Sequence, residues 1–193
     1  MRVYVRLSLP GGLGKRDWHE FVNPLNPAPR TAILLPWFRT KPAIPSWSLH
    51  QRDQARIFPK GWSQEAADFA PAVIAATLDQ LLAIDPKQTS SLTHAVVVLR
   101  RQASPPLSSH DRNLLWEKFG VPMFEQIVGE RGKLLAAECE AHSGLHVFGG
   151  GSQQMLAAPN SEICACGEIV PLLLAAAPEV SALAASAGSF GPE

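Results

Sequence analysis

The distribution of cysteine and histidine constrains this chain more than any other feature of its sequence. All three cysteines, Cys139, Cys164 and Cys166, lie within the segment 139–166, together with His142 and His146, two of the six histidines. An odd number of cysteines does not suit a disulfide framework, whereas thiolates and imidazoles at short spacing are typical metal ligands. The sequence therefore predicts a metal centre with five candidate ligands for four positions.

The segment around Cys139 predicts a β-hairpin that brings two of these candidates together. We expect strands over 134–140 and 145–148 with the turn at 142–143, so that Cys139 faces His146. Directly opposed residues of an antiparallel pair project to the same side, with Cβ atoms about 5 Å apart. One metal ion could therefore be reached from both strands.

The Cys-x-Cys pair would supply the remaining ligands. Cys164 and Cys166 are separated by one residue and followed by a glycine, so both sulfurs can turn toward the hairpin. The predicted ligands are Cys139, His146, Cys164 and Cys166, with His142 as the alternative to His146. Three thiolates and one imidazole favour Zn²⁺ over an iron–sulfur cluster. Four protein ligands leave no open position, which is typical of a structural zinc site. The competing interpretation is three unrelated buried thiols with surface histidines.

Composition and charge restrict the partners of this chain. Of its 193 residues 46% are hydrophobic, enough for a folded core, and 17 basic residues balance 17 acidic ones. No basic segment indicates a nucleic-acid or membrane-surface partner, and no apolar run reaches the roughly 20 residues that span a bilayer. The N-terminal segment lacks the apolar stretch of a signal peptide. We expect a soluble cytoplasmic protein whose partner is another protein.

Hydrophobic periodicity predicts a mixed α/β fold (α+β). Strands are expected over 2–9, 32–35, 95–99, 122–128, 134–140 and 145–148. One helical region begins at Ser63 and continues as a core helix ended by Asp85 and Pro86, with an apolar stripe formed by Val73, Ile74, Thr77, Leu78, Leu81 and Leu82. A second helix begins after Ser108 or Ser109 and stops at Gly120.

The domain organisation follows from these elements. We expect one compact domain over 1–172, with two or three packing helices and a β-meander that carries the zinc-binding segment 119–172. The tail over 173–193 is rich in Ala and Ser and is expected to be partly disordered.

Four acidic residues flank the predicted ligands. They are Glu138, Glu140, Glu162 and Glu168. Each could accept a hydrogen bond from a ligand, but acidic side chains on exposed strands are more often solvated, so we expect them to face solvent.

Three short stretches together resemble a known family. Phe119-Gly120-Val121-Pro122, the run from Glu138 to His146 that contains Gly-Leu-His, and Cys164-Ala165-Cys166-Gly167 are similar to a segment of the phenylacetate–CoA ligase-like branch of the adenylate-forming enzymes. Members of that branch activate a carboxylic acid as an acyl-adenylate and transfer it to coenzyme A. Some bind zinc through a Cys, the His of Gly-Leu-His and the Cys-x-Cys pair. The resemblance covers about 119–172 and implies Cys139, His146, Cys164 and Cys166 as zinc ligands.

The same resemblance implies parts that this sequence lacks. The chain has no Ser/Thr/Gly-rich phosphate loop, the family's Tyr-Gly-x-Thr-Glu is replaced by 124–130, and no Asp lies between His146 and Cys164. Adenylation depends on positioning and neutralising phosphates. We therefore expect a non-catalytic zinc-binding protein, a truncated relative of acyl-adenylate/CoA ligases that acts as a structural or protein-interaction module. The alternative is an accessory subunit or weak enzyme in carboxylic acid activation or CoA-thioester metabolism.

Overall fold

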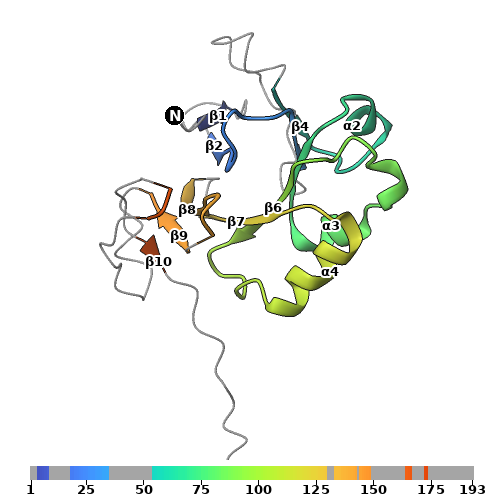
Figure 1. Ribbon diagram of the computed structural model, residues 1–193. Coiled ribbons are helices and arrows are strands. Elements are labelled where there is room, and N and C mark those ends of the chain that lie inside the picture. Colours follow the sequence, from blue (N-terminus) through green and yellow to red (C-terminus); the bar gives the residue numbers. More distant parts are fainter. Residues whose placement is uncertain are drawn as a thin grey trace, which may run out of the picture.

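The computed structural model is built around an eight-stranded mixed β-sheet (Figure 1). The structure describes residues 4–8, 18–34, 54–129, 133–142, 144–148, 164–166 and 172–173. Within them the strand order is β10-β9-β8-β7-β6-β5-β3-β4. These strands are β3 (Thr31–Leu34), β4 (Ala55–Phe58), β5 (Val73–Ala76), β6 (Ala95–Arg101), β7 (Met123–Val128), β8 (Leu134–Glu138), β9 (Leu145–Val147) and β10 (Leu172–Leu173).

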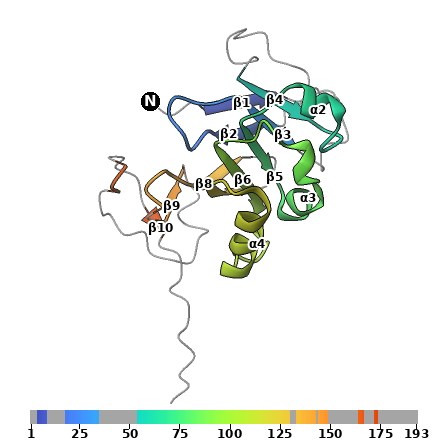
Figure 2. The same cartoon turned by 45° about the vertical axis from the view of Figure 1, so that its right-hand side comes forward.

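The strands from β4 to β7 form the parallel half of the sheet. Parallel strands need crossover connections. α2 (Gln64–Asp68) lies between β4 and β5 in the chain, α3 (Leu78–Ala83) between β5 and β6, and α4 (Ser109–Phe119) between β6 and β7. A 3₁₀ turn, η1, covers Pro86–Gln88. All three helices pack on one face of the sheet, as Figure 2 shows, and bury apolar side chains against the same core. This core joins Ala66, Leu81 and Leu115 of the helices to alternate strand residues, including Ile74, Val96 and Val98.

One expected element is wrong. The apolar spacing of Val73 and Ile74 predicts a core helix here, whereas residues 73–76 form β5, between β3 and β6. Helices α2 and α3 lie on either side of this strand in the chain. Strands of a parallel sheet are covered on both faces and therefore consist of continuous apolar residues instead of alternating ones. All four residues of β5 are fully buried, so their spacing fits a helix and a strand equally well.

The ends of α4 agree with its sequence signals. Ser108 is the N-cap: its hydroxyl oxygen accepts from the Asp111 N–H at 3.1 Å, and the Asp111 carboxylate accepts from the Ser108 N–H at 3.0 Å. Gly120 ends the helix with φ of 62°, a left-handed conformation that a glycine adopts without strain. The prediction of a helix capped by Ser108 or Ser109 is confirmed, with Ser108 as the cap.

The strands from β7 to β10 form an antiparallel meander, which confirms the expected setting of the ligand segment. A separate hairpin, β1 (Tyr4–Ser8) and β2 (Trp18–Val22), lies on the sheet face opposite the helices. Phe21 packs on residues of β3, β5, β6 and β7, while Val22 contacts Leu134 and Ala137 of β8. The Gln126 side-chain amide donates to the Val22 carbonyl oxygen.

The architecture therefore confirms the predicted mixed α/β class, with a β-meander and three α-helices in the described part of the chain. Among the residues described, no helix is long and apolar enough to cross a membrane. Of the tail expected over 173–193, all but Leu173 lies outside the described residues. The single-domain boundary at 172 stays a prediction.

Candidate metal centre

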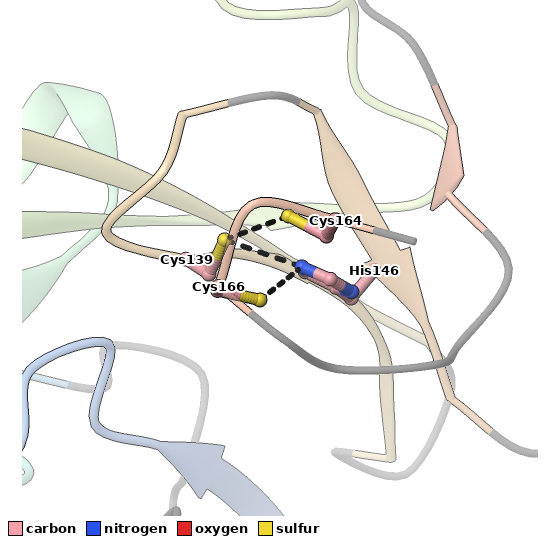
Figure 3. Close-up of side chains that lie close together, drawn as sticks. All are labelled: Cys139, His146, Cys164 and Cys166. Carbon is pink, nitrogen blue, oxygen red and sulfur yellow. Dashed lines mark hydrogen bonds between the residues drawn. The ribbon is translucent and has the colours of Figure 1, made fainter. Parts of the chain in front are cut away.

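Four side chains converge beside β8 and β9. The Sγ atoms of Cys139 and Cys164 are 3.6 Å apart, and the Nε2 atom of His146 lies 3.2 Å from Cys139 Sγ and 3.4 Å from Cys166 Sγ (Figure 3). All four potential ligand atoms lie within 4.8 Å of one another. In a tetrahedron with zinc–ligand distances of about 2.1–2.3 Å, the ligand atoms are separated by roughly 3.4–3.8 Å. The cluster therefore has the size of a tetrahedral metal site.

The four residues that meet are those predicted from the sequence: Cys139, His146, Cys164 and Cys166. His142 does not belong to the group. Its ring is exposed and stacks on Phe124, with 4.6 Å between ring centroids and 15° between planes. The structure thus brings together His146 and the three cysteines, while His142 packs elsewhere.

The turn that presents Cys139 is longer than expected. β8 ends at Glu138, and the Cys139 carbonyl oxygen accepts from the His142 N–H at 3.0 Å. His142 and Gly144 both have positive φ, 49° and 136°. The left-handed region is accessible to glycine and uncommon for other residues, so these two positions shape the loop that leads into β9.

The predicted register of the hairpin is wrong by two residues. His146 pairs with Ala137, and Leu145 pairs with Glu138, so Cys139 lies just beyond the paired strand and not directly opposite His146. The longer turn accounts for the difference. Because side chains alternate with a period of two, a two-residue offset leaves Cys139 on the same face as Ala137 and His146. The four predicted side chains therefore meet although the predicted register is wrong, and their role as metal ligands stays a prediction.

The Cys-x-Cys pair lies in a turn next to this hairpin. Ala165 and Cys166 are turn residues, and β10 then pairs with β9 through Leu172–His146 and Leu173–Leu145. The chain that carries Cys164 and Cys166 is thereby returned to the strand that carries His146.

Burial distinguishes the four groups. Cys139, Cys164 and His146 are 2%, 3% and 0% exposed, while Cys166 is exposed. Burial raises the pKa of the Cys139 thiol to about 12. A thiol in apolar surroundings is neutral at physiological pH, and a bound cation reverses this preference because a coordinating thiol is deprotonated. None of the three cysteines forms a disulfide. The arrangement fits a metal better than it fits three unrelated core thiols.

The acidic neighbours behave differently from one another. Glu140 is exposed, as expected, and accepts from the Asn26 N–H at 3.2 Å. The prediction that these side chains face solvent is wrong for Glu138, which is 8% exposed. Its carboxylate accepts from Arg112 Nη2 at 2.9 Å and from the Glu125 N–H at 2.7 Å. An ion pair with α4 allows this charge to be buried. Glu162 and Glu168 lie outside the described residues.

The fold and the site together define a mixed α/β protein with a Cys₃His group able to hold a metal ion. No protein-family model matches the chain, and no curated protein matches its sequence. A comparison with solved structures matches the chain to an open conformation of 2-hydroxyisobutyryl-CoA ligase in complex with 2-HIB-AMP and CoA. It has 11% sequence identity and a TM-score of 0.49, over 75% of this chain and 44% of that chain. The chain thus spans less than half the length of this acyl-CoA ligase.

Proposed function

We propose that the chain is a zinc-binding protein in which Cys139, His146, Cys164 and Cys166 hold one structural Zn²⁺. The observation that carries the proposal is the convergence of these four ligand atoms within 4.8 Å. Three thiolates and one imidazole are soft and borderline ligands that suit zinc, and a full set of four protein ligands leaves no position for a reacting water. The metal would stabilise the meander and take no part in a reaction.

We further propose that the role is non-catalytic, as a structural or protein-interaction module related to the acyl-adenylate/CoA ligases. The order of the ligands in the chain supports this relation, since Cys139, the Gly-Leu-His containing His146 and the Cys-x-Cys-Gly run follow one another as in the phenylacetate–CoA ligase-like branch. Reduced thiols require a reducing compartment, which supports a cytoplasmic location.

Metal analysis tests the zinc assignment. Protein purified without an affinity tag should contain about one zinc per chain, as a four-ligand site predicts. Cys164→Ser and His146→Ala should each lower both the zinc content and the melting temperature, because binding energy at a structural site is also folding energy. His142→Ala is the matched control and should keep its zinc. Wild-type protein without zinc, or full zinc content in His146→Ala, would refute the assignment.

Calorimetry separates the two functional roles. An interaction module should bind neither ATP nor CoA, since the chain lacks the family's phosphate loop. Saturable binding of either nucleotide by the zinc-loaded protein would contradict the interaction module. It would favour the alternative role as an accessory subunit or weak enzyme in carboxylic acid activation or CoA-thioester metabolism.

A further inference from the structure

Beneath the metal centre, on the helix-covered face of the sheet, four charged side chains from four different elements form one network. Arg100 of β6 donates from Nε to Glu125 Oε1 of β7 at 2.5 Å. Arg112 of α4 reaches Glu125 Oε2 at 3.5 Å and Glu138 Oε1 of β8 at 2.9 Å. The side chains of Arg100, Arg112, Glu125 and Glu138 are 12%, 31%, 6% and 9% exposed. The two arginines and two glutamates give this network a formal net charge of zero.

The network is attached to the metal centre through one peptide bond. Glu138 and Cys139 are consecutive, and because successive strand residues point to opposite faces, Glu138 enters the ion network while Cys139 enters the ligand cluster. A displacement of the Glu138 backbone therefore displaces Cys139 Sγ.

Glu138 also ends the pairing between β7 and β8. Gln126 and Ala137 are the last paired residues of these two strands. The N–H of the preceding residue, Glu125, donates to the Glu138 side chain at 2.7 Å. The Glu138 carboxylate thus accepts hydrogen bonds from a backbone N–H and from the Arg112 guanidinium at the same time. These contacts hold the chain at the point where it leaves the sheet and turns into Cys139.

We infer that Arg112 and Glu138 are positioning residues for the metal centre, so that zinc occupancy and the docking of α4 on the sheet are thermodynamically linked. The inference rests on the proposed zinc site and adds that its affinity depends on a helix that contributes no ligand. Partners outside the ligand set that fix ligand orientation commonly change metal affinity by about 10- to 100-fold. Linkage is reciprocal, so zinc must also strengthen the α4 contact.

The test compares zinc affinity among folded variants of the full chain. Arg112→Met removes the link, but it leaves the Glu138 carboxylate buried without its cationic partner, while Glu125 keeps Arg100. Arg112→Met/Glu138→Gln removes one charge of each sign, keeps the set neutral and retains an acceptor for the Glu125 N–H. The control is Arg56→Met/Glu65→Gln, which removes an exposed ion pair between β4 and α2 at the opposite edge of the sheet.

Zinc affinity is measured by competition with a chromophoric chelator, and site geometry by the absorption of the Co²⁺-loaded protein. The double variant should bind zinc at least about tenfold more weakly than wild type and should show an altered Co²⁺ spectrum. The control variant should match wild type in both zinc affinity and Co²⁺ spectrum. A folded double variant whose zinc affinity is within about twofold of wild type would overturn the inference. Wild-type protein that binds no metal would instead overturn the zinc site itself.

Amide exchange of the wild-type protein gives an independent measurement should the double variant fail to fold. The Glu125 N–H donates to Glu138, so zinc should slow its exchange at least several-fold, whereas the amides of α2 should be unchanged. Equal exchange of the Glu125 amide with and without zinc would overturn the linkage even where zinc binds normally.

Discussion

The four candidate ligands are chemically unequal because only Cys166 is exposed. The Cys139 and Cys164 thiols are buried, and burial raises the pKa of Cys139 to about 12, so little of its reactive thiolate is present at neutral pH. The metal-free protein therefore has one accessible thiol and two protected ones. Chemical modification can measure this difference in accessibility among the three thiols directly.

We predict that alkylation of the folded, metal-free protein modifies Cys166 first. Iodoacetamide followed by peptide mass spectrometry should show Cys166 labelled several-fold faster than Cys139 or Cys164. Added zinc should suppress the labelling of Cys166, because a metal-bound thiolate has its lone pair engaged. Equal labelling rates for the three cysteines in the folded protein would contradict this exposure pattern.

At the scale of single elements, α4 connects the helical layer to the strand that leads into the metal centre. Its start is fixed by the reciprocal hydrogen bonds between Ser108 and Asp111. Its single fully buried residue, Leu115, packs in the core beneath the sheet. The N-terminal cap therefore contributes to the stability of this helix beside the packing of Leu115.

We predict that Ser108→Ala lowers the free energy of unfolding by about 1 kcal/mol, since the Asp111 N–H loses its acceptor. Ser109→Ala is the matched control, because Ser109 is the first helical residue and Ser108 provides the cap. Urea denaturation followed by circular dichroism measures both. Equal destabilisation by the two substitutions would show that Ser108 is not the cap.

The contribution of Asp111 should depend on pH. Hydrogen bonds from the Ser108 hydroxyl and backbone N–H lower the pKa of Asp111 in the folded state. A carboxyl group with a depressed pKa stabilises the fold above its unfolded pKa of about 3.9, and this stabilisation is lost as pH falls through the folded value. Wild type should therefore be more stable than Asp111→Asn at pH 6, with the difference vanishing toward pH 2. If the difference in urea midpoint between wild type and Asp111→Asn did not change with pH, the stabilising role of the ionised Asp111 carboxylate would be contradicted.

The elements that sequence reasoning predicted correctly are those with local signals. Ser108 and Gly120 bracket α4 through hydrogen bonding and backbone conformation, which depend on nearby residues alone. The local pattern predicts a helix for residues 73–76 because it does not reveal what covers the two faces of this strand, the helices on one side and Phe21 on the other. The convergence of Cys139, His146, Cys164 and Cys166 was predictable because few residue types serve as metal ligands, but the hairpin register was not. It depends on backbone torsions at His142 and Gly144 that the sequence does not specify.

The burial of Glu138 had no signal in its own segment. Its partner Arg112 lies on α4, 26 residues earlier in the chain, and the pair becomes visible only when the helix is placed on the sheet. Buried charges are rare unless paired, so a carboxylate near a strand end is reasonably assigned to solvent until the partner is known.

At the scale of the whole molecule, the sheet has two halves with different supports. The parallel half is held by helices on one face and by Phe21 of the β1–β2 hairpin on the other. The antiparallel half contains β9 and β10, of three and two residues, which make few backbone pairs. The candidate metal centre lies in this second half, where short strands contribute little stability of their own.

We predict that removal of zinc loosens the antiparallel half and leaves the parallel half folded. Under a strong chelator, hydrogen exchange should accelerate in β8 and β9, while the amides of β5 and β6 keep their protection. Returning zinc should restore the original rates. Uniform loss of protection across all four strands would show instead that the metal supports the entire fold.

The spacing of the ligands along the chain has one further consequence. A metal held by Cys139 and His146 on one side and Cys164 and Cys166 on the other would act as a cross-link between the two ends of the interval 149–163. Closure entropy grows only logarithmically with length, so doubling such a loop costs only about 0.6 kcal/mol. Insertions within 149–163 should be tolerated as long as both ligand pairs are kept. We therefore expect changes in the length of this interval to have little effect on stability as long as an ion holds its two ends together.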